Sequence, residues 1–71
     1  MKLTDYLKEL STTYSLSLDR VLITVFEVGA EENEILYKGI ADWCWVDGVV
    51  NHAKQTEGYG VLPEWHIWIE K

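Results

Sequence analysis

Few side chains in this sequence can do chemistry. There is one cysteine, Cys44, and there are two histidines, His52 and His66, besides 12 carboxylate residues. A structural zinc site takes four ligands, usually as closely spaced Cys or His pairs, and the sequence has no such pair. A nucleophilic thiol needs local positive charge and a nearby base, but Cys44 stands between two tryptophans and close to two aspartates. We therefore expect no enzyme activity, no metal and no cofactor, and we expect Cys44 to pack in or beside the core.

The acidic character of the chain limits its partners. The formal net charge is −6, which disfavours direct binding to nucleic-acid phosphates and to anionic membrane surfaces. Glu27, Glu31, Glu32 and Glu34 gather around one predicted turn, where side chains are usually solvated. These glutamates favour solubility, and the alternative is an acidic lobe that binds a basic partner, as an inhibitor or a nucleic-acid mimic does.

Aromatic residues are numerous for a chain of this length. Four tryptophans and four tyrosines occur among 71 residues. Tryptophan fills cores with a large apolar area, and it is also enriched where proteins bind one another. Both interpretations stay open from the sequence. Under the second, the candidate partner-binding residues are Trp43, Trp45, Trp68, His66 and Tyr59.

Residues 20–40 form the segment around which the other elements must be organised. Residues 21–28 are mostly β-branched or aromatic, as strands prefer, and a polar stretch with Gly29 and Asn33 separates them from a second such run at 34–40. This pattern predicts a β-hairpin. With Val28 opposite Glu34, the alternation of side chains makes both faces largely apolar, so that both need cover. One face carries Leu22, Thr24, Phe26, Leu36, Lys38 and Ile40, and the other carries Val21, Ile23, Val25, Ile35 and Tyr37.

A helix is predicted before the hairpin, from Thr4 to Thr12 or Thr13, with Thr4 as its N-cap. It is too short to persist alone in water, so we expect it to pack on one face of the hairpin. Its apolar stripe follows the three- and four-residue spacing of a helix, and consists of Leu3, Tyr6, Leu7, Leu10 and Tyr14.

The C-terminal part predicts further strands. Residues 64–70 alternate, with Trp65, Ile67 and Ile69 on one side and His66 and Trp68 on the other. Residues 49–55 allow either a strand, which we prefer because the last strand needs a neighbour, or part of a helix. The expected fold class is α+β in a single domain spanning residues 1–71: one N-terminal helix packed on an antiparallel sheet of three to four strands.

The size of the chain and its single cysteine bear on stability and location. A domain this small buries only about 60% of the surface that its unfolded chain exposes, and disulfides, metals or oligomerisation often compensate. One cysteine cannot form an internal disulfide and suits a reducing cytoplasm. Residues 1–5 lack the apolar region of a signal peptide, and no apolar run has the length of a membrane span. We therefore expect a cytoplasmic protein.

A strand, an acidic turn and the step Lys38-Gly39-Ile40-Ala41 are followed by a short apolar C-terminal strand. Over about residues 20–69, this order resembles small uncharacterised proteins encoded by bacteria and their phages. Such proteins bring no known activity, so the resemblance implies no site residue and no cofactor. It implies a phage association and favours the strand at 49–55.

These patterns together predict a non-enzymatic protein-interaction module. The hairpin has two apolar faces and the chain has a surplus of tryptophans, so the expected partner is a second copy of the chain, in a homodimer held by an apolar, tryptophan-rich face. The first alternative is the acidic inhibitor or nucleic-acid mimic. The second is a small ligand-binding protein, which requires a pocket that holds Cys44, His52 or His66 beside the tryptophans.

Overall fold

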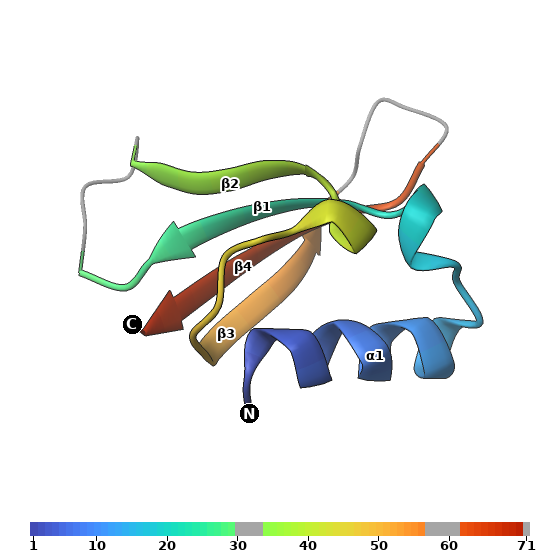
Figure 1. Cartoon of the computed structure of the whole chain (residues 1–71), viewed down its shortest axis with the longest axis horizontal. Helices are drawn as coiled ribbons and strands as arrows, with labels where there is room; N and C mark the ends of the chain where they lie inside the picture. The colour runs from blue at the N-terminus through green and yellow to red at the C-terminus, as the bar shows by residue number, and fades with distance from the viewer. Residues whose placement is uncertain (30–33, 57–61, 71) are drawn as a thin grey trace.

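The structure is a computed structural model of the chain, and it describes residues 1–29, 34–56 and 62–70. Within these residues the chain forms a helix, a four-stranded sheet and two short 3-10 turns (Figure 1). This confirms the α+β class, and residues 49–55 lie in a strand as preferred. The elements are α1 (Leu3–Tyr14), η1 (Leu18–Arg20), β1 (Leu22–Glu27), β2 (Ile35–Ile40), η2 (Ala41–Trp43), β3 (Val49–Thr56) and β4 (Glu64–Glu70).

The sheet consists of two antiparallel strand pairs placed side by side, in the order β2-β1-β4-β3. The inner strands β1 and β4 pair in parallel, so the sheet is mixed, where the sequence led us to expect an antiparallel one. The reason is burial: Ile23 and Val25 of β1 and Ile67 and Ile69 of β4 are almost fully buried. These most apolar strands occupy the centre of the sheet, and the weaker strands β2 and β3 occupy its edges.

The predicted register of the hairpin is correct over most of its length. Leu22 faces Ile40, and the alignment continues to the pair Val25 and Tyr37. A β-bulge then shifts the pairing by one residue, so Phe26 lies opposite Ile35. Such a bulge places one extra residue in one strand. As a result, Leu36 packs against the core while Ile35 is exposed, the reverse of the expected arrangement.

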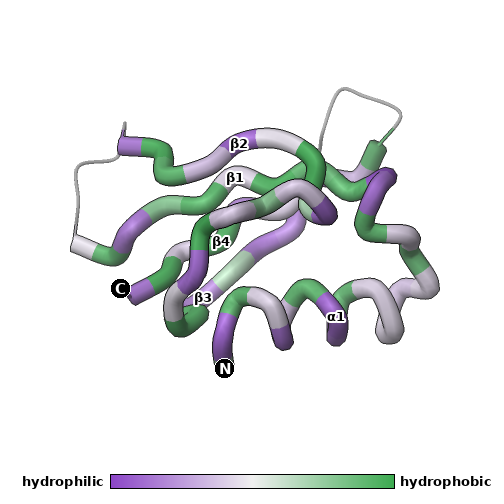
Figure 2. The backbone as a smooth tube through the Cα atoms, viewed as in Figure 1, coloured by the Kyte–Doolittle hydropathy of each residue, from purple (hydrophilic) through white to green (hydrophobic). Residues whose placement is uncertain are grey.

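Helix α1 covers one face of the sheet. Leu3, Leu7 and Leu10 are buried in the core cluster, and Figure 2 shows apolar and polar residues alternating along the helix. The predicted cap at Thr4 is wrong, because the helix begins at Leu3 and the N-cap residue is Lys2, which makes no side-chain cap bond. Instead the Leu3 N–H donates to the carbonyl of Gly48 at 2.9 Å. The chain just before β3 therefore satisfies a donor that a capping side chain often binds.

The chain must pass from one edge of the sheet to the other between β2 and β3. Residues 41–48, the crossing segment, make this connection and run in front of β4 in Figure 1. Ala41 and Val46 are buried with the leucines of α1, so the segment lies on the same side of the sheet as the helix. It is held at its start, where the Ala41 N–H donates to the carbonyl of Val21 at 2.8 Å.

Candidate functional site

The sheet face directed away from α1, here called the open face, is not covered by any helix of the described residues. Leu22, Phe26, Ile40 and Trp68 are half-buried on this face, and the Ile35 side chain is 46% exposed. Strand pairing assigns to the open face Leu22, Thr24 and Phe26 of β1, Ile35, Lys38 and Ile40 of β2, His52, Lys54 and Thr56 of β3, and Glu64, His66, Trp68 and Glu70 of β4.

A row of stacked rings runs across three strands of the open face. The Trp68 ring is nearly parallel to the rings of Phe26 and His52, at centroid distances of 5.0 and 4.5 Å. Because Trp68 has a ring on each side, its flat faces are already occupied. Proteins that bind single-stranded nucleic acid stack bases on free aromatic faces. The faces of the Trp68 ring that contact Phe26 and His52 are therefore not free to stack on a base.

Charged groups of both signs surround the row. The Lys54 ammonium lies 5.8 Å from the centre of the Trp68 ring, within the range of a cation–π interaction. His66 Nε2 lies 3.5 Å from Glu64 Oε1. Lys38 is exposed on the opposite edge strand. The open face thus carries lysines on its two edge strands and carboxylates at the ends of β4, while most of the net negative charge lies elsewhere on the molecule.

The predicted partner-binding residues separate into two groups. Trp68 and His66 lie together on the open face, 6.1 Å apart between ring centroids. Trp43 and Trp45 lie on the crossing segment, on the other side of the sheet, where they are highly exposed. Tyr59 lies outside the described residues.

Three ring-bearing residues were not among the predicted partner-binding residues: Trp65, Phe26 and His52. Trp65 is buried in the core, where its ring contacts that of Tyr14, so core filling is correct for this tryptophan. Phe26 and His52 belong to the row on the open face, although we did not choose them as candidates. The sequence could have indicated Phe26, because strand alternation places it on the same face as Leu22 and Thr24. It could not have indicated His52, because His52 meets Trp68 only through the pairing of β3 with β4.

Cys44 and the histidines are too far apart in the fold to act together. Cys44 is half-buried on the crossing segment, where it lines a shallow hollow of about 170 Å³ between that segment and α1. His52 and His66 lie on the open face, so the sheet separates the thiol from both imidazoles. Among residues 1–29, 34–56 and 62–70, no three Cys, His, Asp or Glu side chains cluster as a metal site requires.

Burial raises the pKa of the Cys44 thiol, and the negative charge of Asp47 raises it further. The thiolate is the reactive form, so iodoacetamide should alkylate Cys44 several-fold more slowly in the folded protein than in urea at the same pH. Folding favours the protonated thiol, so this group's contribution to stability is complete below the thiol's ordinary pKa and is lost as the pH rises through the raised value. Mass spectrometry of alkylation against pH measures the shift; equal rates with and without urea would contradict it.

Comparisons with protein-family models, with curated proteins and with solved structures found no match to this chain. The resemblance to small bacterial and phage proteins therefore stays a prediction. Across the part of the chain that the structure describes, no helix has both the length and the apolar composition to span a membrane.

Proposed function

We propose that this protein is a non-enzymatic interaction module whose open face binds a second copy of the chain. One observation carries the proposal: an apolar strip that includes Phe26, Ile35 and Trp68 is left without cover by the described elements. Burying such side chains stabilises an assembly by roughly 25 cal/mol per Å² of apolar surface. A small domain gains more from this burial than a large one, because its own core is limited.

The charge arrangement favours a second copy as the partner. Lys38 and Lys54 stand on the two edge strands, and Glu64 and Glu70 stand at the two ends of the inner strand β4. A twofold interface places the same patch on both subunits. A twofold axis that lies between two facing sheets, parallel to them and diagonal to their strands, therefore brings the edge lysines of one copy towards the carboxylates at the strand ends of the other. A face with a single sign of charge would repel its own copy.

The size of the open face sets the expected affinity. Four strands about 4.8 Å apart and about six residues long, at about 3.3 Å per residue, give a flat area of roughly 400 Å². A standard interface buries about 800 Å² per partner. We therefore expect a weak dimer, which forms between micromolar and millimolar protein concentration and is in rapid exchange with the monomer.

Ile35→Glu tests the dimer with little risk to the fold, because the side chain is 46% exposed. The variant places an unpaired charge on the apolar strip, where β2 begins, which should weaken association at least about tenfold. Sedimentation equilibrium over a concentration series measures the constant. Thr13→Glu, an exposed position on α1, adds the same charge on the other side of the sheet and should leave association unchanged. A wild-type protein that stays monomeric at millimolar concentration would overturn the proposal.

A further inference from the structure

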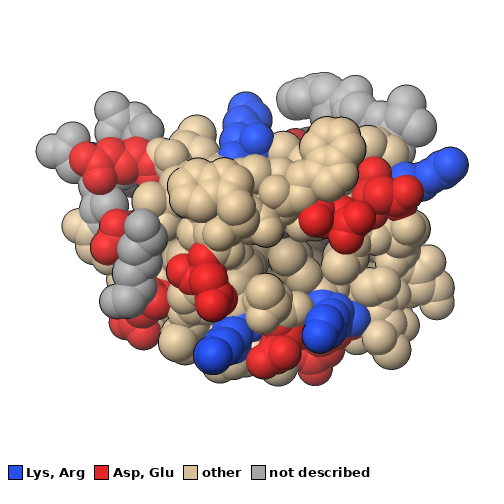
Figure 3. Space-filling view, in the orientation of Figure 1, with Lys and Arg blue, Asp and Glu red and all other residues tan. Residues whose placement is uncertain are grey.

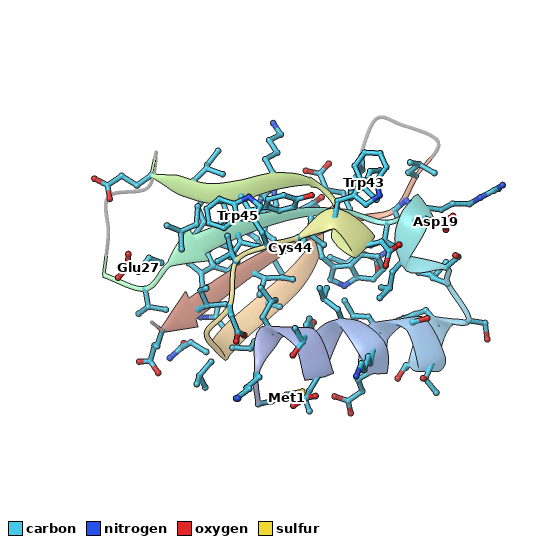
Figure 4. The ribbon with its side chains drawn as sticks, in the orientation of Figure 1. Met1, Asp19, Glu27, Trp43, Cys44 and Trp45 are labelled. Atoms are coloured by element: carbon cyan, nitrogen blue, oxygen red, sulfur yellow. The ribbon has the colours of Figure 1, made fainter. Side chains whose placement is uncertain are left out.

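Trp43 and Trp45 form a second aromatic surface, on the side of the molecule opposite the open face. Exposure alternates along the crossing segment: Trp43 is 73% exposed, Cys44 half-buried, Trp45 78% exposed and Val46 buried. In Figure 4 both indole rings project from this segment away from α1. The core closes through Ala41 and Val46 without either ring. The fold therefore does not account for two large side chains that are left in water.

The segment that carries the two rings is held firmly. The Ala41 N–H is bonded to the carbonyl of Val21, and the carbonyl of Gly48 accepts the N–H of Leu3. Between them the Cys44 N–H donates to the carbonyl of Ala41 at 3.1 Å. Because this backbone is already fixed before binding, a ligand does not need to order it, and little conformational entropy of the protein is lost on binding.

Carboxylates surround the two rings. Asp42 and Asp47 are exposed on the crossing segment itself. Asp19 is exposed on η1, which packs against η2. Figure 3 shows the uncharged centre of this side of the molecule bordered by red carboxylate groups, with blue Lys or Arg groups at the top, at the right and along the bottom. Arg20 lies on η1 beside Asp19, and Lys8 lines the hollow together with Asp42 and Cys44. The surface combines exposed π faces with negative charge.

We propose that this surface, made by Trp43 and Trp45 with Asp19, Asp42 and Asp47, binds an extended basic segment of a partner protein. Arginine stacks on indole rings and pairs with carboxylates at the same time. Trp43 ends η2, Trp45 follows two residues later, and Cys44 between them has extended backbone angles. An extended ligand with arginine at alternate positions places successive arginines on one side of its chain, about 7 Å apart, where they can reach the two exposed rings. The carboxylates repel phosphate, so nucleic acids and anionic membranes are excluded as ligands.

The probe is a fluorescently labelled peptide of alternating arginine and serine, titrated with the full chain and followed by anisotropy. Dilute protein is used, so that the open face is unoccupied and the outcome does not depend on whether the dimer forms. We expect binding that weakens as salt is added, and at least about a tenfold loss of affinity in the Trp43→Ala/Trp45→Ala double variant. Asp42→Lys should weaken binding as well. Tyr14→Ala removes an exposed aromatic side chain of α1 and should leave binding unchanged.

A second measurement is independent of any variant. In nuclear magnetic resonance spectra of the wild-type protein, the peptide should shift the indole N–H signals of Trp43 and Trp45 and leave that of Trp68 in place. Three results would overturn the proposal: no binding at millimolar peptide, equal binding of a glutamate–serine peptide, or equal binding by the double tryptophan variant. Anionic vesicles serve as a further probe, and binding to them through the same tryptophans would also overturn it.

Discussion

Ile67→Ala is expected to remove a large part of the protein's free energy of unfolding. Ile67 is fully buried at the centre of the sheet, where it lies between Val25 of β1 and Ala53 of β3. Truncating a buried isoleucine to alanine costs about 2–5 kcal/mol, through lost apolar burial and the cavity that remains. A domain of this size has a total stability of only roughly 4–10 kcal/mol. The loss is therefore a large part of the whole.

Urea unfolding followed by tryptophan fluorescence measures this loss, because Trp65 is buried in the same core. Ile67→Val removes a single methylene and should lower the free energy of unfolding by about 0.5–1.5 kcal/mol. Ile35→Ala is the matched control: the same truncation at an exposed position should change it by less than about 1 kcal/mol. An alanine at 67 that is tolerated as well as an alanine at 35 would mean that β4 is not the central strand.

Gly48→Ala, which adds a single methyl group, is expected to lower the free energy of unfolding more than any other Gly→Ala substitution among the described glycines. A Cβ at this position would lie 2.9 Å from the carbonyl oxygen of Glu70 and 2.9 Å from Cδ1 of Ile69. Neither distance is compatible with a real contact, and the carbonyl belongs to the backbone, which cannot turn away as a side chain can. Overpacking of this kind costs about 1–3 kcal/mol. The Gly48 carbonyl also receives the Leu3 N–H, so the start of α1 should move with it.

A double variant separates the two contacts. Ile69→Val removes Cδ1 but leaves the Glu70 carbonyl in place, so it should restore only part of the stability lost in Gly48→Ala. Thermal unfolding followed by circular dichroism measures both changes. Glycine-to-alanine substitution usually stabilises a protein where the alanine fits, by about 0.4–1 kcal/mol. An increase in melting temperature for Gly48→Ala would show that β3 and β4 do not approach each other here as the structure describes.

Local patterns predicted the elements of the fold correctly because each depends on near neighbours in the chain. The leucine stripe of α1 placed Leu7 on the packing face of the helix, and the alternation of residues 64–70 placed Trp65 and Ile67 on one side of their strand; all three are buried. The bulge opposite Phe26 could not be predicted in this way. Whether Leu36 or Ile35 faces the core depends on where one extra residue fits between strands, and no local pattern records that position.

The candidate site was predicted only in part, for a related reason. Trp68 and Trp65 have the same residue type and lie three positions apart, and alternation correctly placed them on opposite sides of β4. Which of the two sides belongs to the core was decided by the structure. For Trp43 and Trp45 the sequence left core and surface equally open, because both residues lie outside a regular strand. Their exposure follows from the path of residues 41–48 across the sheet, which depends on distant contacts with Val21 and Leu3.

The sequence by itself determined the α+β class and the lack of a local pattern for a catalytic or metal-binding group, because helical and strand periodicity and ligand spacing are read over a few residues. For residues 49–55 it favoured a strand over a helix, and the structure decided for the strand. Only the tertiary structure decided that β1 and β4 pair in parallel, that Phe26, Trp68 and His52 stack in one row, and that Trp43 and Trp45 lie on the opposite side. These features arise from contacts between residues far apart in the chain. Such contacts depend on how the two strand pairs and the crossing segment share one small core.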